Sequence, residues 1–141
     1  MSDLRLELVI IPVTDVDRAK AFYVDRVGFA LDIDTSPAEG FRVVQMTPPG
    51  SACSITIGTG LGMPSAPGSL KGLHLVVSDI EAAHGELIGR GVPASGVFHF
   101  GPGGRSDGPD PQRSSYNSFV TFDDPDGNTW LVQEVNREGD G

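Results

Sequence analysis

The sequence has a single cysteine, Cys53, and little positive charge. One cysteine cannot form a disulfide within the chain, and it also excludes the zinc motifs that need at least two thiolates at short spacing. We interpret Cys53 as a small hydrophobic residue on a strand. Lys and Arg number 10 against 19 Asp and Glu, which gives a net charge of −9. Because such a negative field opposes nucleic acid and anionic membrane surfaces, we expect neither as a partner, whereas a cationic ligand would be favoured.

Long apolar runs are also lacking. No stretch approaches the roughly 20 apolar residues needed to cross a bilayer, and the N-terminal segment lacks the basic and apolar regions of a signal peptide, so we expect a cytoplasmic protein. Three enzyme motifs are missing as well: the glycines at 58–62 lack the third glycine of a dinucleotide-binding motif, and the sequence has no P-loop and no G-x-S-x-G elbow. The 141 residues, 38% hydrophobic and 21% charged, fit one globular domain.

What the sequence does contain is an internal repeat. The pattern VTDVD at residues 13–17 reappears as VSDIE at residues 77–81. In each copy an apolar stretch precedes the pattern, and apolar residues recur at helical spacing after it. The Thr or Asp of the first copy and the Ser or Asp of the second predict helix N-caps, and Gly28 and Gly91 predict where the helices end.

Short strand-like runs follow each predicted helix. They cover residues 29–34, 41–47, 52–57, 96–100, 118–123 and 129–135. The sequence therefore predicts an α+β fold of two tandem βαβββ modules within a single domain. Module 1 covers about 4–57 and module 2 about 70–135, with a Gly/Ser/Pro linker at 58–69 and a C-terminal tail at 136–141.

Residues 101–116, inside the second module, are predicted to be an irregular loop. A loop of this length is either a lid or binding loop, or a solvated mobile connection. The side chains that could close on a substrate are Arg105, Asp107, Asp110, Arg113 and Tyr116.

The order of several motifs resembles a known family. These are the two V-x-D helix starts, A-F-Y at residues 21–23 and D-P-D-G-N at residues 124–128. Together they resemble the vicinal oxygen chelate superfamily, which includes glyoxalase I, bleomycin-resistance proteins, fosfomycin-resistance enzymes and extradiol dioxygenases. The resemblance covers nearly the whole chain. It implies that the modules form a cupped mixed sheet with the helices on its outer face, around a site that often holds a divalent metal, and it implies a homodimer.

The resemblance also implies where metal ligands would lie. The matching positions here hold Leu8, Ser54, Gly72 and Leu131. Two hydrocarbon side chains and a glycine offer no donor, and a neutral serine hydroxyl is a poor one. We therefore expect no metal and no other cofactor, as in the branch in which bleomycin-resistance proteins bind and sequester a drug.

Because strand side chains alternate, these positions also define which residues face the cup. The predicted ligand-binding residues are Leu8, Ser54, Thr56, His74, Leu131 and Gln133, with His99 near the mouth. Such a mixture of apolar and polar groups is typical of ligand sites. The opposite face, with Leu73, Leu75, Trp130 and Val132, is expected to pack against the helices, and Glu134 is expected to be a rim or interface charge.

The histidines and Gln133 leave alternatives open. His74 is either a buried histidine satisfied by a neighbour or a ligand-facing group able to act as a general base. His99 looks into the cup or faces solvent at a sheet edge, and Gln133 orients a ligand or forms a structural hydrogen bond. Two functions follow: a metal-independent protein that binds a small hydrophobic or cationic molecule, or a lyase or isomerase of the glyoxalase-like class that uses His74 as acid or base.

Overall fold

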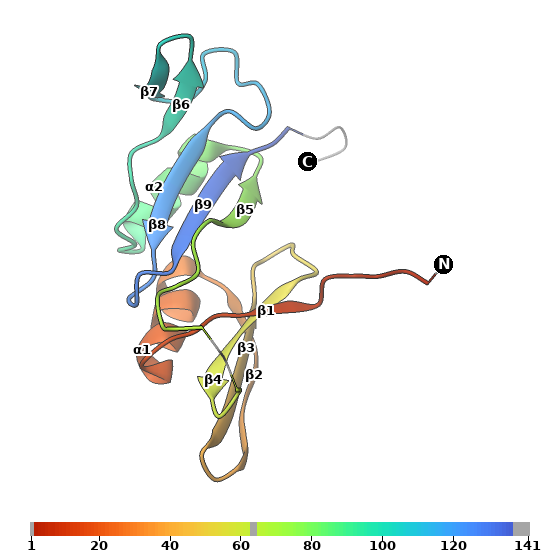
Figure 1. The fold of residues 1–141 in the computed structure, drawn as a ribbon. Coiled ribbons are helices and arrows are strands. Elements are labelled where there is room, and N and C mark those ends of the chain that lie inside the picture. Colours follow the sequence, from red (N-terminus) through yellow and green to blue (C-terminus); the bar gives the residue numbers. More distant parts are fainter. Residues whose placement is uncertain (1, 63–64, 137–141) are drawn as a thin grey trace. The chain divides into compact units, whose positions relative to one another are not determined.

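The computed structural model describes residues 2–62 and 65–136, which fall into two compact units (Figure 1). Unit 1 contains the described residues up to Leu70 together with Asp124–Asn128, and unit 2 contains the others. Each unit has its own mixed sheet and its own helix, which confirms the α+β class. Within the described residues, no helix is long and apolar enough to span a membrane.

Unit 1 is a βαβββ module. Its elements are β1 (Leu8–Ile10), α1 (Val16–Ala21), the π-helical turn η1 (Phe22–Val27), β2 (Ala30–Ala38), β3 (Phe41–Thr47) and β4 (Ser54–Thr59). The sheet order is β1-β4-β3-β2, with β1 parallel to β4 and the other neighbours antiparallel.

The helix of unit 1 begins and ends where the sequence predicts. Of the two candidate caps it is Asp15 whose side chain accepts a hydrogen bond from the Arg18 N–H, at 3.0 Å. The helix ends at Gly28, whose φ of 92° lies in the left-handed region that glycine adopts without steric cost.

Unit 2 repeats this plan with one strand more. Its elements are β5 (Leu73–Val77), α2 (Ile80–Gly89), β6 (Phe98–Gly101), β7 (Gly104–Asp107), β8 (Phe119–Asp123) and β9 (Thr129–Glu134). The sheet order is β5-β9-β8-β6-β7. Helix α2 is capped by Asp79, which accepts from the N–H groups of Glu81 and Ala82.

The additional strand corrects part of the expectation of an irregular loop at residues 101–116, because β7 covers residues 104–107, whereas residues 108–116 contain no helix or strand. Strands β6 and β7 form an antiparallel hairpin in which Gly101 pairs with Gly104. Gly104 has a φ of 99°, so the glycine-rich sequence that reads as a loop supplies the backbone freedom for a tight turn instead.

In each unit one face of the sheet packs against the helix. In unit 1 this face carries the buried side chains Ile11, Val44, Met46, Ile55 and Ile57. In unit 2 Trp130 and Val132 are buried on the helix side, whereas His74 on the other face is exposed. The alternation predicted for β5 and β9 is therefore confirmed, although Leu73 and Leu75 are half-buried, not fully buried as Trp130 and Val132 are, and each sheet has one face that its own helix does not cover.

The turn Asp124–Asn128 between β8 and β9 belongs to unit 1. The Tyr23 hydroxyl donates to the Asp124 carboxylate at 2.8 Å. The buried Asn128 amide donates to the Pro12 carbonyl at 3.0 Å and accepts from the Leu70 N–H at 3.1 Å. The D-P-D-G-N motif thus satisfies one backbone group near the start and one at the end of the main chain segment of unit 1.

Candidate functional site

The open face of unit 1 brings together three of the predicted site residues. Strand β1 runs parallel to β4, with Leu8 opposite Ser54 and Ile10 opposite Thr56. Ser54 and Thr56 are 5% and 4% exposed, so both hydroxyls lie beneath the surface of this face. The next strand adds Gln45, which is opposite Thr56.

Polar side chains cross this face from β4 to β2. The Gln45 amide nitrogen lies 3.5 Å from the Ser54 hydroxyl, which is 2.6 Å from the Thr47 hydroxyl. The Thr47 hydroxyl in turn donates to the Asp32 carboxylate. The Thr56 hydroxyl is buried and has no hydrogen-bond partner among the described residues.

The open face of unit 2 carries His74, Leu131 and Gln133. His74 lies opposite Leu131 in the β5–β9 pair, and Gln133 is on the same side of β9. His74 is exposed, so the interpretation as a buried histidine is wrong. Its Nδ1 lies 2.8 Å from the Gly72 carbonyl oxygen. Since a carbonyl only accepts, Nδ1 carries the proton, and in the neutral ring Nε2 presents its lone pair.

An aromatic cluster continues this face. Phe119 pairs with Gln133 across β8 and β9 and stacks on Phe98 with ring centroids 5.4 Å apart. Phe100 contacts Phe119 edge-on at 5.6 Å and is itself exposed. The Arg105 guanidinium lies 3.7 Å from the Phe98 ring centroid. The F-H-F alternation at residues 98–100 was the sequence signal for this cluster, because alternate residues of a strand share a face.

Gln133 and His99 are both held by backbone groups of unit 2. The Gln133 amide donates to the Tyr116 carbonyl at 3.1 Å, which is the structural hydrogen bond considered above. His99 has the opposite orientation to Phe98 and Phe100, so the structure does not bring it onto the face of His74. Its Nδ1 lies 2.8 Å from the Gly108 carbonyl oxygen.

His99 instead lines a separate cleft of about 380 Å³, together with Asp110 and Asn117. The Asn117 amide both donates to the Phe100 carbonyl and accepts from the Phe100 N–H. The Asp110 carboxylate accepts from the N–H groups of Gln112 and Ser114, and these bonds hold its pKa below the usual range against the opposing effect of burial. The polar groups of this cleft are therefore largely used within the loop itself.

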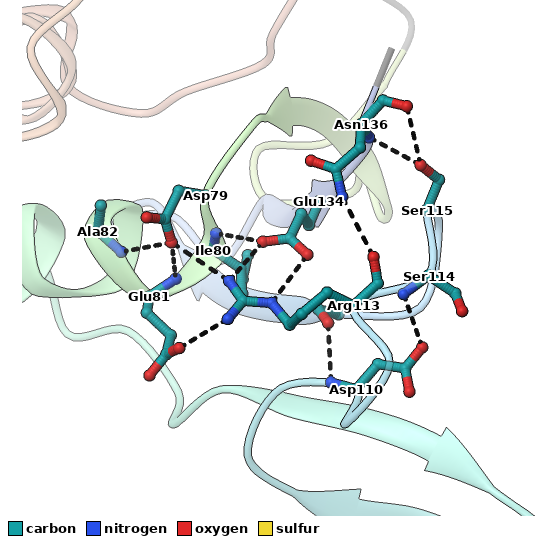
Figure 2. A network of polar contacts seen from close by, with 11 residues as sticks. Asp79, Ile80, Glu81, Ala82, Asp110, Arg113, Ser114, Ser115, Glu134 and Asn136 are labelled. Atoms are coloured by element: carbon teal, nitrogen blue, oxygen red, sulfur yellow. Dashed lines mark hydrogen bonds and ion pairs between the residues drawn. The ribbon is translucent and has the colours of Figure 1, made fainter. Parts of the chain in front are cut away.

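Arg113 anchors this loop to the start of α2, as Figure 2 shows. Its guanidinium binds Glu134 through two contacts, Nη2 to Oε1 at 2.7 Å and Nε to Oε2 at 3.1 Å. It also reaches Glu81 at 2.8 Å and Asp79 at 3.3 Å. Strand pairing and this charged network therefore connect parts of the 101–116 segment to the rest of unit 2, while residues 102–107 are exposed to solvent.

Glu134 itself is 1% exposed, so its interpretation as a rim or interface charge is also wrong. Its Oε1 accepts from the Ile80 N–H at 3.0 Å, which satisfies a free amide in the first turn of α2. The Arg113 hydrogen bond lowers the pKa of the Glu134 carboxyl, with the Ile80 N–H acting in the same direction, while burial acts to raise it. This carboxylate is therefore a structural anchor.

The positions that would hold a metal in related folds do not fit one here. Leu8 and Leu131 present hydrocarbon, and the Ser54 hydroxyl is engaged with Thr47. Gly72 has no side chain, and its N–H bonds the Thr129 hydroxyl at 2.8 Å. Across residues 2–62 and 65–136, no group of three His, Cys, Asp or Glu side chains is arranged to bind a metal ion.

Two α+β units, each with a helix on one face of its sheet and an open second face, define a class of small proteins with paired modules. The profile of the Glyoxalase/Bleomycin resistance protein/Dioxygenase superfamily matches residues 5–132, and the chain belongs to this superfamily. No protein of curated function matches the sequence.

Solved structures agree with this membership. TnmS3, an antibiotic binding protein from Streptomyces sp. CB03234, is 32% identical with a TM-score of 0.73, over 96% of this chain and 99% of that one. A glyoxalase/bleomycin resistance protein from the same organism is also 32% identical, with a TM-score of 0.69, over 92% and 100% of the two chains. A superfamily member from Sphaerobacter thermophilus is 27% identical, with a TM-score of 0.71, over 94% and 98%.

Proposed function

We propose that this protein binds a small molecule on its open sheet faces without the help of a metal ion. A relative described as an antibiotic binding protein shares 32% of its residues over nearly the full length of both chains. The open faces combine apolar groups such as Leu8 and Leu131 with hydroxyl, amide and imidazole groups, which is the usual make-up of a small-molecule site. The net charge of −9 favours a cationic ligand over an anionic one.

The observation that carries the proposal is the chemistry of the residues at the four positions where the family resemblance implies metal ligands, namely Leu8, Ser54, Gly72 and Leu131. Leu8 and Leu131 replace metal donors with apolar surface on the very strands that line the open faces. A divalent ion needs several nitrogen, oxygen or sulfur donors converging on one point, whereas a hydrophobic or cationic organic molecule gains from apolar contact and a few polar groups.

Calorimetric titration of the purified full chain with bleomycin and a panel of aromatic and cationic antibiotics tests this function. We expect at least one compound to bind stoichiometrically, and chelator to leave both its affinity and the melting temperature unchanged. His74→Ala and Gln133→Ala should weaken binding, whereas the matched control His84→Ala, on α2, should not. One transition metal per chain in elemental analysis, or binding that disappears with chelator, would contradict the proposal.

The second candidate function is a lyase or isomerase step on a small carbonyl compound. The hydrogen bond between His74 Nδ1 and Gly72 favours it, because this tautomer directs a basic nitrogen away from the backbone on an exposed face. Turnover of a carbonyl substrate that His74→Ala abolishes and His84→Ala preserves would establish the enzyme. Unchanged turnover in His74→Ala would exclude this role for the imidazole.

The proposal includes a homodimer in the cytoplasm and a single two-module domain. Leu4 and Leu6 are large exposed hydrophobic side chains, and β1 is an edge strand of its sheet, so a second copy has apolar surface to cover. Light scattering at micromolar concentration should give twice the 14.8 kDa of one chain. A mass equal to that of one chain would rule the dimer out.

A further inference from the structure

We infer that the open face of unit 1 recognises a hydrogen-bond donor on the ligand, an amine or a hydroxyl group; this inference rests on the proposed binding function. The feature that carries it is a polar row across three strands, formed by Asp32 on β2, Gln45 and Thr47 on β3, and Ser54 and Thr56 on β4. Asp32 lies at the irregularity between Leu31 and Ile33, where the register of β2 shifts.

The hydrogen bonds of the row have one direction. A carboxylate only accepts, so the Thr47 hydroxyl gives its proton to Asp32. Thr47 has no second proton, and its 2.6 Å contact with Ser54 therefore requires Ser54 to be the donor. Ser54 has then spent its own proton, so in its contact with Gln45 it accepts from the amide nitrogen.

This order leaves hydrogen-bond acceptors that no other residue of the row uses. The Gln45 side chain uses one N–H of its amide toward Ser54, and its carbonyl oxygen remains as an acceptor. The hydroxyls of Ser54 and Thr47 have lone pairs but no protons to offer. Only the second Gln45 N–H and the unpartnered Thr56 hydroxyl still have protons to donate. The acceptors of this surface therefore outnumber its donors, which favours a ligand group that donates hydrogen bonds.

Thr56 gives independent support because its buried hydroxyl forms no hydrogen bond with the described residues. It lies opposite Gln45 on β3 and Ile10 on β1, and it is 4% exposed. Its hydroxyl has no partner among the described residues, although buried polar groups are nearly always paired. A ligand amine or hydroxyl that reaches the Gln45 carbonyl would also satisfy Thr56, and an ammonium group would gain from the negative charge of the protein.

A series of three probes with one apolar part tests the inference: phenethylamine, 2-phenylethanol and ethylbenzene. Their dissociation constants for the full chain are measured by NMR titration, with backbone amide shifts to locate each probe. We expect the amine to bind tightest, the alcohol next and the hydrocarbon least, with the largest shifts on β3 and β4. Thr56→Val should weaken the amine by about tenfold, the effect of one charge-assisted hydrogen bond, should weaken the alcohol by less because its hydrogen bond is neutral, and should leave ethylbenzene unchanged.

The matched control is Thr59→Val on the same strand, three residues from Thr56 and so on the other side of β4, opposite Arg42, which should change none of the three. Thr56→Val should not lower the melting temperature, because its hydroxyl has no partner to lose. The inference is overturned if ethylbenzene binds as well as the amine, if none of the probes binds, if Thr56→Val leaves the amine unaffected, or if that variant is strongly destabilised. Antibiotic binding with no preference for the amine probe would leave the proposed function standing while this inference fails.

Discussion

The two units begin their helices with the same motif but anchor it differently. In unit 1, the Thr14 N–H and hydroxyl both donate to the Asp126 carboxylate. In unit 2, the Ile80 N–H donates to buried Glu134, which Arg113 neutralises. The repeated sequence therefore supplies the cap, whereas the partner that holds the first turn differs between the units and comes from a segment distant in the sequence.

The open faces of the two units also differ, although the helix-covered faces are alike. Unit 1 presents the polar row, and unit 2 presents His74 beside the aromatic cluster of Phe98, Phe100 and Phe119. The helix side of each sheet is mostly apolar because it must fill a core, with buried Glu134 as an exception on β9, while the open side is free to diverge. The two faces consequently offer different chemistry to a ligand.

If the two cores are equivalent, replacing one fully buried isoleucine by alanine in either unit should lower the free energy of unfolding by the same amount. Ile57 in unit 1 and Ile80 in unit 2 are both fully buried. Ile57→Ala and Ile80→Ala should each lower the free energy of unfolding by about 2 to 5 kcal/mol, through lost burial and the cavity left behind. Urea denaturation measures both, with half-buried Ile10→Ala on the open side as the smaller control. A larger loss in Ile10→Ala than in Ile57→Ala would reverse the assignment of faces.

The two anchors should be unequal in strength. Arg113→Met leaves the Glu134 carboxylate buried and without its cation, and we expect a loss of about 3 kcal/mol, at the lower end for such pairs because the Arg113 side chain is 37% exposed. Arg18→Met removes the 3.3 Å contact with Asp126 and a 3.1 Å hydrogen bond to the Thr14 hydroxyl, both made by a half-exposed arginine, and should cost under about 1 kcal/mol.

Adding Glu134→Gln to Arg113→Met should recover part of this loss, since the unpaired buried charge is then absent. Thermal or chemical unfolding of the three variants settles the comparison. Equal losses for Arg113→Met and Arg18→Met would show that the two anchors contribute alike.

The Arg113–Glu134 pair of unit 2 should also make the free energy of unfolding decrease in acid. The folded pKa of Glu134 lies below its ordinary value of 4.5, so its contribution is complete above that value and is lost as pH falls toward the folded pKa. In Glu134→Gln the decrease in stability below pH 4.5 should be shallower than in the unaltered protein. Denaturation midpoints between pH 6 and pH 3 measure the difference, and parallel curves would mean that Glu134 does not contribute.

Local sequence patterns predicted the parts of the fold that depend on neighbours in the chain. The helix caps at Asp15 and Asp79 follow from short-range hydrogen bonds, and the alternation of β9 follows from strand geometry. The hairpin of β6 and β7 was missed because the same glycines suit an open loop or a tight turn, and only pairing with β8 favours the latter.

The candidate site was predicted in part for the same reason. Ser54, Thr56 and His74 followed from alternation along single strands, whereas Gln45 and Thr47 needed the register of β3 against β4. The alternation of side chains along a strand could not predict the place of Asp32, because Asp32 lies where β2 shifts its register. The pairing of Arg113 with Glu134 depends on the path of a long loop, which local propensities do not determine.

The turn Asp124–Asn128 has a consequence for how the protein is made. Unit 1 is otherwise built from the first residues to be synthesised. However, the Pro12 carbonyl and the Leu70 N–H bond Asn128, and the Tyr23 hydroxyl bonds Asp124, and both of these partners are synthesised late. Domains near the N-terminus usually fold first during translation. Here the earlier half cannot complete its hydrogen bonds until nearly the whole chain exists, so a nascent chain released after the linker would carry a first unit that lacks these three hydrogen bonds.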